Sequence, residues 1–143
     1  MTEDTLHLLK ECDAGSKTAV NSIKEVLDNV KSTELISILT KSVERHEEIG
    51  NELHERLNEE GKGGKEPNVM ARAMSWMKIN AKILAEPSDK TIADLMTDGC
   101  NMGIKTLASY KNKYPNADKA AVRLADRIIG EEEQLIEDLK KFL

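Results

Sequence analysis

Two residues that could ligate a metal ion interrupt apolar stripes of the sequence. His46 lies between Val43 and Ile49, where helical periodicity expects an apolar side chain. Glu132 interrupts a second stripe, one turn before Leu135. Imidazole nitrogens and carboxylate oxygens are the side-chain ligands that helical bundles use for metals. A lone buried charge is costly, so something must satisfy both groups.

Aligning Leu53 with Leu139 places His46 opposite Glu132 in an internal repeat. Glu47 completes our set of candidate metal ligands, and further carboxylates could supplement it, namely Glu44, Asp13, Asp98 and Glu131. The alternative is that His46 and Glu132 pair with each other or with water, or lie at a stripe edge. We favour this alternative over a mononuclear or degenerate dinuclear metal site.

The sequence lacks the motif of an oxygen-activating diiron enzyme. Such a site needs Glu-x-x-His on two helices, because residues three apart share a helix face. The second predicted helix offers Asn51 with His54 at this spacing, the last one has no histidine, and His7 is close to the N-terminus. We therefore assign no catalytic residue and favour a protein that is not an enzyme.

The frame C-x-x-G-x-K-T occurs twice, at residues 12–18 and 100–106. Cys12 and Cys100 fall on inward stripes, where free cysteine acts as a small buried hydrophobe. The glycines would allow close helix contact, and the lysines are predicted to point to solvent (Gly15, Gly103, Lys17, Lys105).

Apolar residues at steps of three and four predict helices over residues 5–30, 34–60, 68–85, 89–114 and 117–142. Ser32 and Thr33 are the expected capping residues before the second helix, and Ser88 and Asn116 are the expected N-caps of later helices. We predict a single domain, 1–143, with a hairpin at 5–60, a crossover at 61–88 and a hairpin at 89–143. A full-length helical crossover would make the second and third long helices of this all-α four-helix bundle parallel. A tight connection giving up-down-up-down order is the alternative.

Composition excludes several classes of partner. The net charge is −5 and 33% of residues are charged without a basic stripe, which argues against nucleic acid. No apolar run approaches the length of a membrane span. The start lacks the pattern of a signal peptide, and two distant cysteines fit a reducing interior, so we expect a cytoplasmic protein.

The crossover helix carries a group of residue types that are favoured at interfaces, namely Met70, Met74, Trp76 and Met77. This face could assemble a homo-oligomer. The alternative, which we prefer, is that it packs on the bundle.

The chain resembles the ferritin-like superfamily, in particular its rubrerythrin-related bacterial four-helix-bundle proteins of unassigned function. The resemblance is carried by residues 13–19, by Glu52-Leu53 before a glycine-rich break, by Trp76 on the connector, and by residues 98–110. It implies a ferritin-like bundle with a long helical crossover between two antiparallel hairpins. We expect a non-enzymatic binding or interaction module with a degenerate metal site and no cofactor. The alternative is a metal-binding or redox protein that holds iron, manganese or another divalent metal through His46 and core carboxylates.

Overall fold

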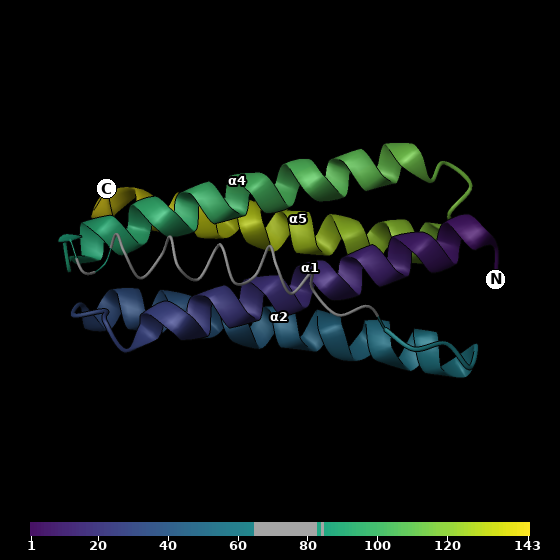
Figure 1. Cartoon of the computed structure of the whole chain (residues 1–143), viewed down its shortest axis with the longest axis horizontal. Helices are drawn as coiled ribbons and strands as arrows, with labels where there is room; N and C mark the ends of the chain where they lie inside the picture. Colours follow the sequence, from purple (N-terminus) through teal and green to yellow (C-terminus); the bar gives the residue numbers. More distant parts are fainter. Residues whose placement is uncertain (65–82, 84) are drawn as a thin grey trace.

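The computed structural model describes residues 1–64, 83 and 85–143 (Figure 1). These residues form four long helices and a short 3-10 helix, with no strand among them, which confirms the prediction of an all-α four-helix architecture. The helices are α1 (Glu3–Leu27), α2 (Thr33–Glu59), α4 (Asp89–Lys113), α5 (Lys119–Leu139) and η1 (Lys140–Phe142). The predicted interface residues Met70, Met74, Trp76 and Met77 lie outside the described residues.

Each long helix begins at a residue whose side chain accepts a hydrogen bond from a backbone N–H of the first turn. These N-caps are Thr2, Ser32, Ser88 and Asp118. The predictions for Ser32 and Ser88 are confirmed, but the prediction for Asn116 is wrong. The backbone N–H of Asn116 donates instead to Asp4 at 2.8 Å, which ties the loop to α1. The helix then starts two residues later, where Asp118 accepts from the N–H of Ala121 at 2.9 Å.

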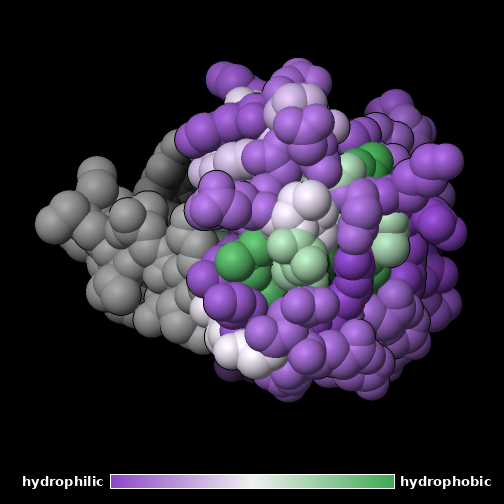
Figure 2. All heavy atoms as spheres, turned by 90° about the vertical axis from the view of Figure 1, so that its right-hand side faces the viewer, coloured by the Kyte–Doolittle hydropathy of each residue, from purple (hydrophilic) through white to green (hydrophobic). Residues whose placement is uncertain are grey.

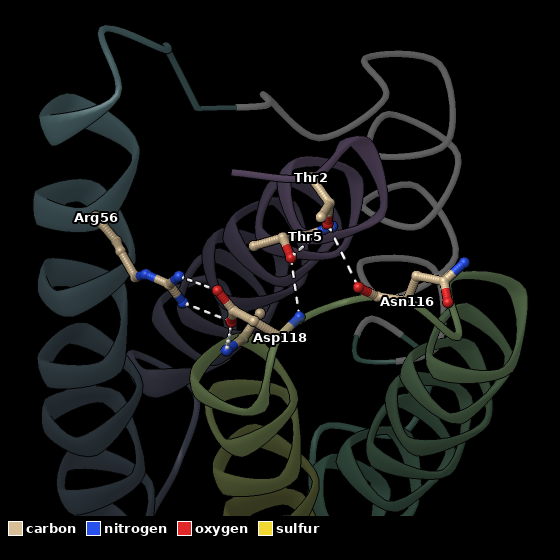
Figure 3. Close-up of polar contacts among 6 residues, drawn as sticks. Thr2, Thr5, Arg56, Asn116 and Asp118 are labelled. Carbon is tan, nitrogen blue, oxygen red and sulfur yellow. Dashed lines mark hydrogen bonds and ion pairs between the residues drawn. The ribbon is translucent and has the colours of Figure 1, made fainter.

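One end of the bundle is closed by a polar network that joins three segments (Figure 3). The N–H of Asp118 donates to the Thr5 hydroxyl at 2.9 Å, and the Thr2 hydroxyl lies 3.4 Å from the carbonyl of Asn116. Arg56 pairs with both carboxylate oxygens of Asp118, one of them at 3.1 Å. The start of α1, the end of α2 and the α4–α5 loop therefore meet at this end.

The opposite end is fixed by Asp89 at the start of α4. Its carboxylate accepts hydrogen bonds from the backbone N–H groups of Lys31 and Ser32, at 2.8 and 2.9 Å, just before α2. Helices α2 and α4 therefore begin at the same end of the bundle and run in the same direction (Figure 1). Helix α1 packs against α2 and α4, and α5 packs against α4, α2 and α1.

The apolar core is divided into two clusters, one toward each end of the bundle. One cluster contains Val43, Cys100 and Leu135, and the other contains Ile49, Leu107 and Ile128. The residues between the clusters, which we call the central polar layer, are Ser16, His46, Gly103 and Glu132. All four long helices thus contribute one polar or glycine residue at the middle of the molecule.

The end of the bundle at which α1 begins is mainly hydrophilic (Figure 2). Figure 2 views the end where α1 begins, and hydrophilic residues surround a small hydrophobic area between the helix ends. No helix in the described part of the chain is both long and apolar enough to cross a bilayer.

We predict that Asp118→Ala lowers the free energy of unfolding by about 1–2 kcal/mol, because it removes the N-cap of α5. Asp118→Asn keeps a capping oxygen and loses only the charge opposite Arg56, an exposed pair that contributes at most about 1 kcal/mol. Urea unfolding of both variants measures the difference. An equal loss in the two variants would show that the cap contributes little.

Candidate functional site

The structure brings His46 and Glu132 together at the centre of the bundle. His46 on α2 is completely buried, and Glu132 on α5 is only 6% exposed. The Nε2 atom of His46 lies 3.4 Å from the Oε1 atom of Glu132. The sequence left open whether His46 and Glu132 pair with each other, and in the structure their side chains face each other.

The orientation of the His46 ring is set by its own helix. Its Nδ1 atom lies 2.8 Å from the carbonyl oxygen of Ser42, one turn earlier, and must carry a hydrogen to donate to it. The Ser42 hydroxyl is also within 3.4 Å of Nδ1. Because Nδ1 is engaged in this way, Nε2 is the atom directed toward α5. A histidine that holds a metal is usually fixed by the same kind of bond through its other nitrogen.

The contact between Nε2 and Glu132 is an ion pair with poor hydrogen-bond geometry. In the described part of the chain, Nε2 has no hydrogen-bond partner of normal geometry. Burial lowers the pKa of His46, but the carboxylate of Glu132 opposes this effect, and the net result is a pKa above the ordinary value of 6.5. The carboxylate of Glu132 thus favours protonation of the imidazole that faces it, and when both groups are charged each compensates the other.

The side chain of Glu132 lies against α4 beside Gly103. A Cβ atom added to Gly103 would lie 3.4 Å from Oε1 of Glu132 and 3.6 Å from its Cδ atom. These distances correspond to ordinary van der Waals contact. The predicted close contact of α4 at Gly103 is therefore a contact with the buried acid of α5.

Both cysteines are buried and free, and neither is suited to thiolate chemistry. Burial, together with the charges of Glu11, Asp13 and Asp126, raises the pKa of Cys12 to about 12. Burial and the neighbouring Glu132 carboxylate also raise the pKa of Cys100. The two sulfurs belong to different apolar clusters, so they do not meet across the core.

The third candidate ligand, Glu47, does not join the buried pair. Its side chain is half exposed and lies 3.3 Å from Lys24 on α1. Of the supplementary carboxylates, Glu131 pairs with Arg45 at 3.5 Å, and Glu44 and Asp98 are exposed. Within residues 1–64, 83 and 85–143, no group of three or more His, Cys, Asp or Glu side chains could hold a metal ion.

Asp13 is part of a second buried polar group, most of which the sequence did not reveal. Its side chain is completely buried, with Lys17 Nζ 2.9 Å from one carboxylate oxygen and His54 Nε2 2.8 Å from the other. The prediction that Lys17 points to solvent is therefore wrong, because the i, i+4 spacing brings it back onto Asp13. That spacing was visible in the sequence, whereas the contribution of His54 from α2 was not.

Two shallow hollows lie side by side on the face between α2 and α5. Their volumes are about 330 and 390 Å³, and Arg45 and Glu131 line both of them. The first also contains Ser42, whose carbonyl orients His46, together with charged residues of both signs. This face therefore offers a polar surface rather than an apolar pocket.

In comparisons with known proteins, the chain matches no family model, no curated protein and no solved structure.

We predict that His46 and Glu132 act as a unit in stability. Glu132→Leu or His46→Leu alone leaves a buried group without its partner and lowers the free energy of unfolding by about 3–5 kcal/mol. The double substitution replaces both groups by apolar side chains and recovers most of this loss, because neither charge remains to be compensated. A double-mutant cycle in urea measures the coupling, and additive effects of the two single changes would contradict the pairing.

We also predict a specific pH dependence. Because the pKa of His46 is raised in the folded state, its stabilisation is fully present below the unfolded pKa of about 6.5 and is lost as pH rises through the folded pKa. The urea midpoint of the wild type should therefore decrease as the pH is raised from about 6 to the end of the His46 titration. The variant with leucine at both positions lacks this component. An equal change of the urea midpoint with pH in both proteins would contradict the predicted contribution of His46.

Proposed function

We propose that this protein is a non-enzymatic, ferritin-like four-helix bundle, which acts as a binding or interaction module and whose central metal site is degenerate. The observation that carries the proposal is the buried pair of His46 and Glu132 at 3.4 Å. An imidazolium and a carboxylate compensate each other, so the centre of the bundle requires no ion for charge balance.

The direction of the helices supports the ferritin-like part of this proposal. Helices α2 and α4 start at the same end, where Asp89 contacts residues 31 and 32. Parallel second and third long helices are typical of bundles with one long crossover, and ferritin-like folds have such a crossover.

The chemistry of the described side chains supports a role without catalysis. The buried cysteines are poor nucleophiles because their pKa values are raised. The hollows between α2 and α5 are lined by charged residues of both signs, including Arg45 and Glu131. Such a surface suits reversible contact with another polar surface, and the pair of His46 and Glu132 would hold α2 and α5 in register.

A second candidate function is metal binding through His46 and Glu132. It is favoured by the buried Nε2 atom, which faces a carboxylate at a distance close to that between two tetrahedral ligands bound about 2.0–2.1 Å from an ion. The residues present do not complete such a site, however, because the pair supplies two ligands and a closed structural zinc site uses four.

The content of metal distinguishes the two candidates. Protein purified without chelator is expected to hold far less than one equivalent of iron, manganese or zinc, measured by plasma emission spectroscopy, and His46→Ala should not change this value. The variant with leucine at both positions serves as a folded control that has no ligands at the centre. A stoichiometric metal that disappears in both variants would overturn the first proposal and establish the second.

A further inference from the structure

A series of ion pairs, which we call the charge ladder, runs along the seam between α2 and α5 and continues to η1. Its members are Glu34–Lys141, Arg45–Glu131, Glu52–Arg127 and Arg56–Asp118. The last of them is drawn in Figure 3. The residue number rises along α2 while that of the partner falls, as expected for antiparallel helices. Each pair therefore marks one level of the bundle, with one charge on each side of the seam.

The sign of the charge alternates from each level of the ladder to the next. The residues of α2 are in turn acidic, basic, acidic and basic, and the residues across the seam have the opposite sign at every level. The ladder thus holds as many acidic as basic groups, although the chain has a net charge of −5. This face therefore does not add to the electrostatic repulsion between two copies of the chain.

The charged groups of the ladder are open to solvent. The side chains of Glu34 and Lys141 are 58% and 56% exposed, and those of Arg45 and Glu52 are both 51% exposed. The two hollows between α2 and α5 lie beside them and offer room for long side chains from outside. Each of these charges contacts an opposite charge of its own chain and can still meet a second one.

A two-fold axis parallel to the bundle makes this face complementary to itself. A half-turn about such an axis keeps every level at its height and places α2 of one copy opposite α5 of the other. Because the two sides of the seam carry opposite signs at every level, each charge then meets an opposite charge of the partner. At each level, the charges of the two copies alternate in sign around a square.

The alternation also selects one register of the two copies. Sliding one copy by one level would place like charges opposite each other, which suppresses association. The levels are unevenly spaced along α2, at residues 34, 45, 52 and 56. A partner turned end for end would therefore not bring its levels into line with those of the first copy.

We propose that the α2–α5 face is the surface through which two copies of this chain associate, about a two-fold axis parallel to the bundle and with their charge ladders in register. This inference rests on the proposed role as an interaction module and names its partner. Because exposed ion pairs contribute little individually, the dimer is a transient one. The alternating charges determine the orientation of the partner more than the affinity.

Sedimentation velocity of the whole protein at low salt tests this proposal, since the pairs are least screened there. The wild type should change from monomer to dimer as its concentration rises from micromolar to millimolar. Arg45→Glu should raise the dissociation constant by about tenfold or more, because it faces Glu131 of the partner with a like charge. Lys111→Glu is the matched control, since Lys111 pairs with Asp126 across the α4–α5 seam, and it should leave dimerisation unchanged.

A charge exchange separates this role from an effect on folding. Arg45→Glu combined with Glu131→Arg restores the pair within each copy and, by symmetry, between two copies of the variant. The exchanged variant should therefore dimerise with itself as the wild type does. Its mixed dimer with the wild type places like charges together and should be weaker by about tenfold, measured with one of the two proteins labelled.

Three results would overturn the proposal: a wild type that stays monomeric, a dimer that Arg45→Glu does not weaken, or a mixed dimer as strong as the two homodimers. None of them changes the metal content that tests the proposed function. The dimer and the degenerate metal site can therefore fail separately.

Discussion

The rest of this bundle is arranged around the need to bury a histidine and a carboxylate in an otherwise apolar interior. A buried charge is tolerated only where an opposite charge and hydrogen bonds compensate its lost hydration. His46 meets this requirement through Glu132 on one side and the carbonyl of Ser42 on the other. The apolar residues consequently form two clusters, one on each side of the pair, instead of one continuous core.

The same physical solution occurs twice in the structure. Glu132 and Asp13 are both buried carboxylates that face a histidine from α2, and a glycine lies against each of them. At Gly103 an added Cβ would be in ordinary van der Waals contact with the carboxylate, whereas at Gly64 it would overlap with it. Only at Gly64 does the observed position of the carboxylate therefore require a residue without a side chain.

The sequence predicts those features that depend on a single helix. The interruptions of the apolar stripes located His46 and Glu132, and local capping chemistry located Ser32 and Ser88. Some features that depend on contacts between helices were missed or misplaced. Asn116 and Asp118 are both good N-cap residues, and only the contacts of Asp118 with Thr5 and Arg56 decide between them. His54 was missed because it lies off the apolar stripe of α2, and its partner is on another helix.

The two residues of the buried pair are of opposite charge type. Identical acidic residues at positions 46 and 132 would place two like charges opposite each other in the core. Opposite charges make α2 and α5 complementary, so sliding one helix along the other by a turn would face His46 with the apolar Ile128 or Leu135 instead of Glu132. A buried group left without its partner costs several kcal/mol. The pair therefore selects one register of the bundle, even where apolar packing alone would tolerate several.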